Sequence, residues 1–259
     1  LTFEIFPQHD WKDALKYQVL ARWSAERADH LIADSENTRQ DLMDLYRIPE
    51  SRITVVRLGV AEAFRPQPPD AVAAVRSLHE LPERYLLYVG VLQPRRNLSR
   101  LLNAYARIQR GRADCPPLVL VGGGWYESAL RAQAATLGLG GLVRFLGHVP
   151  DEELPALYAG AQFLVYPSLY EGFGLPPLEA MACGCPVIVS WASSLPEVVG
   201  DAGLQVNPYR VEAMAEAMQS LLEDEGQRAR LRAAGLARAR RFSWAQAAAE
   251  TAAVFRTLA

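Results

Sequence analysis

The sequence predicts a protein of the α/β class, with a parallel sheet that is covered by helices on both faces. From about residue 84 onward, short apolar runs alternate with longer segments of helical period. No run exceeds five residues, and the runs are rich in branched and aromatic side chains, which favours strands buried on both faces. Alternation at this spacing is typical of a parallel sheet with right-handed crossovers, whose ligands bind at the carboxyl ends of the strands.

Six strands and the helices between them form the main domain, which is expected at residues 71–241. The expected strands are Tyr85–Val89, Leu118–Val121, Val143–Leu146, Phe163–Tyr166, Val187–Val189 and Leu204–Val206. The expected helices between them span residues 97–110, 125–137, 151–160, 175–183 and 194–199.

Two longer helical segments follow the last strand. In the first, apolar residues recur at helical spacing, at Val211, Met214, Ala215, Met218, Leu221 and Leu222. The final segment, residues 242–259, opens with Ser243 and Gln246 at the spacing of a capping box. One face of it carries Trp244, Ala247, Ala248, Thr251, Val254 and Phe255. We interpret both stripes as packing surfaces rather than as cofactor sites.

The first sixty residues follow a different pattern. A helix at about residues 11–28 leads to a short strand, His30–Asp34, after which Ser35 can cap a helix that ends near Tyr46. Ile53–Arg57 is a second strand, and the proline-rich residues 61–70 are typical of a linker. Two strands are too few for a stable sheet, so residues 1–60 are interpreted as the end of a domain whose beginning is absent.

Charge and cysteine content narrow the function classes. The 259 residues carry 27 basic and 29 acidic side chains, a net charge of −2, which gives no reason to expect a nucleic-acid partner. Three cysteines, Cys115, Cys183 and Cys185, are too few for a disulfide scaffold and indicate reduced, cytoplasmic thiols. The four histidines are scattered, so neither a metal site nor a cofactor is expected.

No apolar run approaches the roughly 20 residues that a membrane-spanning helix needs. The protein is therefore expected to be cytoplasmic, and peripheral attachment to the inner face of the membrane is left open.

The first candidate site follows the strand Tyr85–Val89. Gly90 lets a ligand approach the backbone closely, and Arg95 and Arg96 stand just before a helix that Asn97 can cap. Arginine offers planar, bidentate donors suited to phosphate oxygens, and a helix N-terminus adds positive potential. A solvated basic turn accounts for these residues equally well.

The second candidate is the run Gly122, Gly123 and Gly124 between a strand and a helix. Its exposed backbone N–H groups allow a phosphate or a sugar to approach the main chain. The run matches neither a P-loop nor a G-x-G-x-x-G fingerprint. Glycine runs of this kind occur in tight turns for purely structural reasons about as often as they bind a ligand.

The third candidate follows the strand Phe163–Tyr166 and is the strongest of the three. Glu171 lies on a glycine-containing loop, and the helix Leu175–Gly184 tolerates two prolines in its first turn. Amides around residues 172–175 are expected to form an anion site at this helix N-terminus. Glu179 lies roughly one turn into the helix. Two carboxylates beside one anion site can bind paired hydroxyls, whereas interaction with the helix dipole accounts poorly for both acids.

The third motif resembles the E-x(7)-E signature of retaining, nucleotide-sugar-dependent glycosyltransferases of family 4. The signature runs from Glu171 to Glu179 within Y-E-G-F-G-L-P-P-L-E-A-M-A-C-G-C-P-V-I. The resemblance extends through Y-V-G-V-L-Q-P-R-R-N, V-R-F-L-G-H-V and S-S-L-P-E-V-V-G-D-A-G-L, and so covers residues 85–207 in order. Members have the GT-B architecture, two Rossmann-like domains that face each other across a cleft.

The resemblance assigns these domains. It implies that residues 71–241 are the C-terminal, donor-binding Rossmann-like domain and that residues 1–60 are the tail of the N-terminal acceptor domain. The rest of that N-terminal domain would be a missing partner. The last helix, within residues 242–259, would cross back to brace it.

The resemblance also implies roles for single residues. Arg95 and Arg96 would clamp the donor diphosphate and stabilise the departing nucleoside diphosphate, with Glu171 holding sugar hydroxyls and Glu179 the ribose hydroxyls. His148 and Val149 would receive the base, largely through main chain. The remaining donor-binding residues are Gly90, Gly122, Gly123, Gly172, Phe173, Gly174 and Leu175, of which the last four would offer backbone donors to the sugar and the β-phosphate.

Two positions depart from the family pattern. The family most often has lysine where Arg96 stands, and some members have arginine where Val91 stands. Of the 27 basic residues only Lys12 and Lys16 are lysines, so the replacement at position 96 fits the composition of the chain. Arginine is bulkier and more fixed in geometry than lysine, which leaves reduced activity open.

The implied reaction is transfer of a hexose from a nucleotide-diphosphate sugar to a glycan or lipid-linked acceptor, with retention and without a metal. Cations and a helix N-terminus would stabilise the diphosphate as the oxocarbenium-like sugar forms, while a phosphate oxygen takes the acceptor proton. The form V-G-V-L-Q-P-R-R-N resembles mannosyltransferases of cell-surface polysaccharide assembly, which favours GDP-mannose over UDP-sugars. The alternatives are a nucleotide-sugar-binding module without transfer activity and a GT-B epimerase or phosphorylase. The chain alone is expected to bind the donor but to be incomplete for catalysis.

Overall fold

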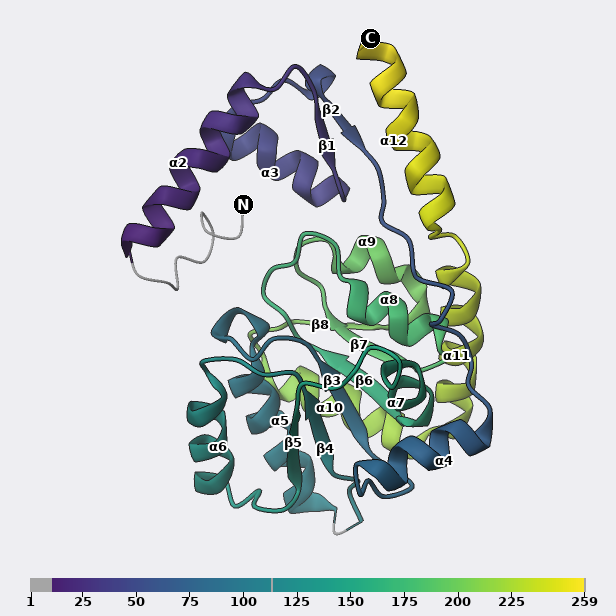
Figure 1. Cartoon of the computed structure of the whole chain (residues 1–259). Coiled ribbons are helices and arrows are strands. Elements are labelled where there is room, and N and C mark those ends of the chain that lie inside the picture. The colour runs from purple at the N-terminus through teal and green to yellow at the C-terminus, as the bar shows by residue number, and fades with distance from the viewer. Residues whose placement is uncertain (1–10, 113, 259) are drawn as a thin grey trace.

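A six-stranded sheet lies at the centre of the larger part of the molecule, residues 69–241 (Figure 1). The computed structural model describes residues 11–112 and 114–258. All neighbouring strands of this sheet are parallel, and every residue of β3, β4, β6 and β7 is buried, as expected for strands covered on both faces. The strands are β3 (Leu86–Val89), β4 (Leu118–Val121), β5 (Val143–Gly147), β6 (Phe163–Tyr166), β7 (Val187–Ser190) and β8 (Leu204–Val206).

The order of the strands identifies the binding edge of the sheet. Along the sheet they run β5-β4-β3-β6-β7-β8, so the chain proceeds outward from β3 in one direction and outward from β6 in the other. Strands β3 and β6 are neighbours, with Leu86 beside Phe163. In open α/β sheets the crevice for a ligand lies at such a reversal, outside the carboxyl ends of the two strands. The loops that follow β3 and β6 therefore border the expected crevice.

The helices of the larger part fall into two groups, which meet where α10 contacts α11. Helix α5 contacts α6 and α10, while α8 contacts α7, α9 and α11, and α4 contacts α7. These helices are α4 (Pro69–Leu78), α5 (Leu98–Gly111), α6 (Glu127–Thr136), α7 (Leu154–Gly160), α8 (Leu175–Ala182), α9 (Leu195–Val199), α10 (Val211–Glu223) and α11 (Glu225–Ala239), with the 3₁₀ turns η2 (Pro94–Arg96) and η3 (Gly200–Ala202). The expected parallel sheet with helices on both faces is confirmed.

The smaller part holds a sheet of only two strands, which are parallel. It comprises α2 (Trp11–Arg27), β1 (Leu31–Ala33), α3 (Glu36–Tyr46), the 3₁₀ turn η1 (Glu50–Arg52) and β2 (Ile53–Val55). A small separate cluster of buried side chains, Ala25, Ala33, Tyr46, Ile48 and Ile53, holds these elements together. As expected, Ser35 caps α3, its Oγ accepting from the N–H of Thr38 at 3.0 Å.

Two stretches of chain connect the parts, and they pass each other in contact. The N–H of Val60 donates to the carbonyl of Phe242 at 3.3 Å, and Val60 also bridges to Ser243. A Cβ at Gly59 would lie 2.1 Å from the nitrogen of Trp244, so only glycine permits this approach. Beyond the crossing, α12 (Trp244–Leu258) runs up toward the smaller part (Figure 1).

Two helix starts differ from the sequence-based expectations. The start of helix α4 was expected to be part of the linker. Pro69 nevertheless fits the first turn of a helix, because the N–H groups of that turn have no acceptor within the helix and proline lacks only such an N–H. Asn97 does not cap α5 through its side chain. Its backbone is left-handed, with φ of 61°, and its amide donates instead to the carbonyls of Pro167 and Pro208 at 3.1 and 2.7 Å.

The apolar face of the last helix packs less than its pattern suggests. Ala247 and Val254 are buried, but Trp244 is 48% and Phe255 64% exposed. Both exposed rings line a groove of about 510 Å³ between α12 and the smaller part. The capping box is half formed, because Ser243 Oγ accepts from the N–H of Gln246 while the Gln246 side chain donates to Glu250.

Candidate functional site

The loops after β3 and β6 meet at the reversal point of the sheet. The guanidinium of Arg95 donates through Nη1 to the carbonyl of Tyr170 at 2.8 Å and to Oε2 of Glu171 at 3.2 Å. The guanidinium of Arg96 forms an ion pair with the other carboxylate oxygen, Oε1. In return, the N–H of Leu169 donates to the carbonyl of Arg95 at 2.8 Å. The first and third sequence motifs therefore form one cluster.

This cluster carries a net positive charge in a largely buried place. The side chains of Arg95, Arg96 and Glu171 are only 15%, 12% and 8% exposed. Burial, and next to it the positive charge of Arg96, lowers the pKa of Arg95 from its ordinary value. The Nε of Arg96 is buried and makes no hydrogen bond to a described residue. Two guanidiniums around one carboxylate, with a donor unused, suit a multiply charged anion.

Two tyrosines lie under the arginines. The Arg96 guanidinium lies 5.4 Å from the ring centroid of Tyr166 and donates to its hydroxyl. Tyr88 stacks on Tyr166 with centroids 5.8 Å apart, and its hydroxyl donates to the carbonyl of Val91 at 3.3 Å. Both tyrosines are fully buried, and burial raises the pKa of each hydroxyl, which keeps it neutral. They hold Arg96 against the sheet and were not anticipated, because both resemble ordinary strand core in the sequence.

The loop that carries Glu171, residues 167–174, is held from two sides. Ser194 Oγ donates to the carbonyls of Glu171 and Phe173 at 3.1 and 2.6 Å. Ser193 Oγ accepts from the N–H of Glu171 at 2.8 Å. From the smaller part, Ser35 Oγ donates to the carbonyl of Gly172 at 2.6 Å. The carbonyls of residues 171–173 thus accept hydrogen bonds from serine side chains outside the loop.

The N–H groups at the start of α8 have no acceptor. Within residues 11–112 and 114–258, the backbone nitrogens of residues 172–175 donate to no other residue. Gly174 has a φ of 113°, and a Cβ there would lie 2.7 Å from Cδ2 of Leu195. A Cβ at Gly172 would lie 2.8 Å from Oδ2 of Asp34. The left-handed backbone of Gly174 requires glycine, whereas at Gly172 only the carboxylate end of the Asp34 side chain stands in the way. The loop leaves a row of free donors at a helix N-terminus.

Glu179, on α8, has a different partner from Glu171. Its Oε2 accepts a hydrogen bond of 2.9 Å from the hydroxyl of Tyr158 on α7. Burial raises the pKa of Glu179 above its ordinary value of 4.5; the Tyr158 hydrogen bond opposes the shift and the charge of Asp151 adds to it. No hydrogen bond or ion pair joins Glu179 to Glu171 in the part of the chain that the structure describes.

The glycine-rich run after β4 divides into structural and open positions. A Cβ at Gly122, where φ is 112°, would lie 2.3 Å from the carbonyl oxygen of Gly90, and one at Gly124 would lie 2.2 Å from that of Leu92. At Gly123, which is exposed, a Cβ would meet no described atom within 4 Å. Close packing of two loops therefore explains Gly122 and Gly124, and only Gly123 faces open space.

The residues expected to receive the base lie at the end of β5, two strands from β3. His148 is exposed and Val149 is buried. The carbonyl of Gly147 accepts from the N–H of Gly122 at 2.7 Å, which ties this loop to the glycine-rich run. No hydrogen bond or ion pair links His148 or Val149 to the arginine cluster among the described residues, so a bound nucleotide would have to span the two places.

Comparison with known proteins identifies the family. Residues 74–238 match the family described as glycosyl transferases group 1, which is well over half of the chain. The chain belongs to the glycosyl transferases group 1 family. Residues 2–64 match a second description, glycosyltransferase family 4. The resemblance seen in the E-x(7)-E motif is thereby confirmed.

Relatives in this glycosyltransferase family are similar over most of the chain. O-antigen chain mannosyltransferase B of Escherichia coli is 38% identical over 255 residues, which cover 97% of this chain and 67% of that protein. D-inositol 3-phosphate glycosyltransferase of Thermobispora bispora is 35% identical over 241 residues, 88% of this chain and 56% of that protein. The chain thus spans between about half and two thirds of the length of these relatives.

Solved structures agree with the family. Sucrose-phosphate synthase from Thermosynechococcus elongatus superposes with a TM-score of 0.83 at 29% identity, over 97% of this chain and 63% of that one. Anabaena HepE, solved in complex with UDP and glucose, gives a TM-score of 0.84 at 23% identity, over 97% and 69%. The expected fold, the Rossmann-like C-terminal half of a GT-B glycosyltransferase, is confirmed.

Membrane-spanning helices and clustered metal ligands are both absent from the described residues. None of the helices in this part of the chain is both long and apolar enough to pass through a membrane. Nor do residues 11–112 and 114–258 contain a group of three or more histidine, cysteine, aspartate or glutamate residues placed to hold a metal ion.

Proposed function

We propose that this glycosyltransferase moves a mannosyl residue from GDP-mannose to a glycan or lipid-linked acceptor, with retention at the anomeric carbon and without a metal. The mannose assignment is supported by two relatives named as mannosyltransferases of Escherichia coli, O-antigen chain mannosyltransferase B and the serotype-specific WbdA, which is 34% identical over 229 residues. Cell-surface polysaccharide is the acceptor class that the first name suggests.

The buried, free thiols of Cys115, Cys183 and Cys185 support a cytoplasmic location.

One observation carries the donor site: Arg95 and Arg96 surround Glu171 at the reversal point of the sheet, beside the unbonded N–H groups of residues 172–175. A nucleoside diphosphate would place its phosphates between the guanidiniums and the N-terminus of α8. Fixed donors there would stabilise the charge that builds up on the diphosphate as the glycosidic bond breaks. The chain's own cations would thereby do the work of a metal ion.

Glu171 would change partners when the donor binds. In the structure both of its carboxylate oxygens are engaged by arginines. A diphosphate would compete for the same guanidiniums, which would free the carboxylate to accept hydrogen bonds from hydroxyls of the sugar. The acceptor hydroxyl would then attack from the face of the leaving group and pass its proton to a departing phosphate oxygen.

Glu179 would bind the ribose. Tyr158 occupies Oε2, and Oε1 accepts no hydrogen bond from a described residue, so it is available for the paired hydroxyls. The base would lie toward His148 and Val149, with Gly90, Gly122 and Gly123 lining the path between. In this arrangement the two motif acids contact opposite ends of the donor.

Titration calorimetry tests the site. GDP is expected to bind more tightly than UDP, and Arg96→Ala is expected to weaken GDP binding about tenfold or more, since a hydrogen bond to a charged group contributes about 1.5–3 kcal/mol. Arg107→Ala is the matched control, because Arg107 is 62% exposed and pairs with Glu212 at 3.6 Å away from the cluster. Equal loss of affinity in the two variants would refute the site.

A transfer assay on the full-length gene product tests the reaction. Labelled mannose from GDP-mannose is expected in a lipid-linked glycan product, in the presence of a chelator, with the anomeric configuration of the donor retained by NMR. Binding of GDP with no transfer from any nucleotide sugar would identify a binding module instead. Inversion at the anomeric carbon would refute the proposed mechanism.

A further inference from the structure

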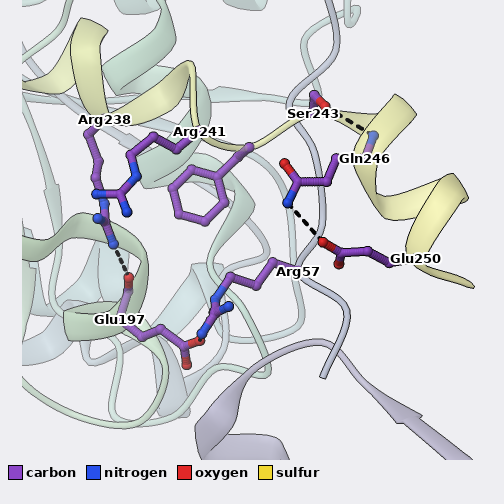
Figure 2. A pocket seen from close by; sticks show the side chains of 8 residues that line it. Arg57, Glu197, Arg238, Arg241, Ser243, Gln246 and Glu250 are labelled. Atoms are coloured by element: carbon purple, nitrogen blue, oxygen red, sulfur yellow. Dashed lines mark hydrogen bonds and ion pairs between the residues drawn. The ribbon is translucent and has the colours of Figure 1, made fainter. Parts of the chain in front are cut away.

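A pocket of about 450 Å³ lies where the two connecting stretches pass each other (Figure 2). We call it the crossing pocket. It is separate from the donor site. Arg57 from the connection after β2 and Glu197 from α9 line it, together with residues from the end of α11 to the first turns of α12, which are Arg238, Arg241, Phe242, Ser243, Gln246 and Glu250. No residue of the E-x(7)-E motif or of the arginine pair at positions 95 and 96 lines it.

Three arginine side chains converge on the crossing pocket, and only one of them has a carboxylate partner. Arg57 pairs with Oε1 of Glu197 at 2.8 Å. Arg238 instead donates to two backbone carbonyls at the end of α9, those of Val198 and Glu197, at 3.0 and 2.5 Å. The guanidinium of Arg241 makes no hydrogen bond or ion pair with another described residue. Two of the three guanidiniums therefore form no ion pair with a carboxylate in the part of the chain that the structure describes.

The two acids that line the pocket form no ion pair with Arg238 or Arg241. Glu197 is shared between Arg57 and the N–H of Glu36, which donates to Oε2 at 2.8 Å. Glu250, on the α12 side, accepts from the Gln246 side chain at 2.8 Å and pairs with none of the arginines (Figure 2). Burial, and after it the positive charges of Arg241 and Arg57, lowers the pKa of Arg238, while the charges of Asp201 and Glu197 oppose part of this shift.

The N-terminus of α12 adds to this positive potential. Ser243 lines the pocket and caps the helix, its Oγ accepting from the N–H of Gln246 at 3.1 Å. A helix of fifteen residues presents the positive end of its dipole here. Arginine forks and a helix N-terminus are the two features that proteins combine to bind oxyanions.

Phe242 connects the pocket to the loop that carries Glu171. Its ring lines the pocket and lies edge-on to the ring of Phe173, with centroids 5.8 Å apart. The Arg238 guanidinium lies 5.3 Å from the Phe242 centroid on the pocket side. An occupant of the crossing pocket would therefore be one aromatic contact away from the donor loop.

We propose that the crossing pocket binds a phosphate monoester or inorganic phosphate, held by Arg241 and Arg238 in front of the N-terminus of α12. The doubly charged oxyanion relieves the repulsion among the guanidiniums, and the bidentate geometry of Arg241 is free to receive it. Arg57 stays paired with Glu197 and closes the pocket toward the smaller part.

Calorimetric titration with inorganic phosphate, at constant ionic strength set by chloride, tests this proposal. The donor site also contains phosphate-binding groups, so the titration is repeated with Arg95→Gln. Saturable binding is expected in the native chain and in Arg95→Gln. Arg241→Gln is expected to weaken it at least about tenfold, a loss of about 1.4 kcal/mol.

Arg240→Gln is the matched control, because it removes the same charge from the adjacent, exposed residue outside the pocket. It is expected to change phosphate affinity less than about twofold, within the range of long-range charge effects. The side chain of Arg241 makes no hydrogen bond to another described residue, so Arg241→Gln is expected to leave the stability of the fold unchanged. An unchanged melting temperature confirms that any loss of phosphate affinity does not come from unfolding. Absence of saturable binding, equal loss in the two variants, or loss in Arg95→Gln alone would each overturn the proposal.

Glycerol phosphate distinguishes the two sources of the anion. Tighter binding than inorganic phosphate indicates an ester whose organic part contacts Phe242. Equal or weaker binding, still dependent on Arg241, indicates inorganic phosphate itself. Both results support the site, whereas glycerol phosphate binding that is indifferent to Arg241→Gln counts against it.

Discussion

The hydroxyl of Ser35 donates a hydrogen bond of 2.6 Å to the carbonyl oxygen of Gly172. The same hydroxyl oxygen accepts the N–H of Thr38, so one fully buried side chain both caps α3 and holds the loop of Glu171. Tyr170 adds a second connection, since its hydroxyl donates to Asp41 on α3 at 2.7 Å. The loop that would bind the sugar is thus positioned in part by a helix of the smaller part.

Ser35→Ala is expected to slow transfer more than it weakens nucleotide binding. It removes a cap and a buried hydrogen bond, at a cost of about 1–2 kcal/mol in the free energy of unfolding. The carbonyl of Gly172 loses the shorter of its two hydrogen bonds and keeps the one from the Thr38 hydroxyl at 3.3 Å, so Glu171 is held less firmly, while the arginines remain in place. Denaturant unfolding, kcat and the Kd for GDP check this.

The control for this change is Asp224→Ala. Asp224 caps α11 by accepting from the N–H of Gln227 at 2.7 Å and does not contact the loop. It is expected to lower stability by a similar amount and to leave kcat unchanged. A parallel fall of kcat in both variants would mean that stability alone, and not the position of the loop, limits transfer.

Glu171→Gln is expected to tighten GDP binding and to abolish most of the transfer. The carboxylate engages both guanidiniums, so the diphosphate must compete with it. Removing its charge is expected to improve the Kd for GDP roughly 3- to 10-fold, or about 0.6–1.4 kcal/mol. Glu127→Gln, which breaks the exposed pair with Arg131 on α6, is expected to leave the Kd unchanged. Weaker GDP binding in Glu171→Gln would contradict the competition.

Glu179→Gln is expected to stabilise the fold increasingly as the pH rises above about 4.5. Burial raises the pKa of Glu179, so the folded state holds this proton more tightly than the unfolded chain does. That contribution to stability is complete below the unfolded pKa and is lost as the pH rises through the folded pKa. Glutamine cannot ionise and still accepts from Tyr158.

Urea unfolding at pH 4.5 and pH 7 measures this difference, with Glu216→Gln on the exposed side of α10 as the control. Glu179→Gln should show a gain at pH 7 that is much reduced at pH 4.5, and the control should show none. The same gain at both pH values would exclude burial of the charge as its cause.

Gly122→Ala and Gly123→Ala form a matched pair. At Gly122, φ is 112° and a methyl group would lie 2.3 Å from the carbonyl oxygen of Gly90, so a loss of about 1–3 kcal/mol in stability is expected. At Gly123 a methyl group meets nothing within 4 Å, and the change is expected to be neutral or to stabilise by up to about 1 kcal/mol. Thermal unfolding compares them, and a larger loss at Gly123 would refute this account.

The strands were predictable because each is a short run of mostly apolar residues between helical segments, and four of the six are buried on both faces. The observed strands Leu118–Val121, Phe163–Tyr166 and Leu204–Val206 match the expected ranges, and the other three differ only at their ends. That Arg95, Arg96 and Glu171 act on one donor was implied only by the family resemblance. Their meeting in the fold has a physical reason, since parallel strands bring their carboxyl ends to one edge.

The residues that hold the site in place could not be predicted from the sequence, because each of them contacts a residue that is distant in sequence. Ser193 and Ser194 stand in the motif S-S-L-P-E-V-V-G-D-A-G-L, yet only the fold places them against the Glu171 loop. Tyr166 has the same pattern as any strand residue until Arg96 is placed above it. Asn97 has the residue type of a cap, but its left-handed backbone turns the amide toward Pro167 and Pro208.

The contact of Gly59 with Trp244 bears on how such enzymes can be recombined. A chimaera that takes the larger part from a relative with another donor preference must cut the chain twice, near residues 60 and 242. The two new junctions then lie against each other, where a Cβ at position 59 would meet a backbone nitrogen at 2.1 Å. A junction near residue 60 must therefore keep glycine at position 59 wherever the backbone of residue 244 passes this close.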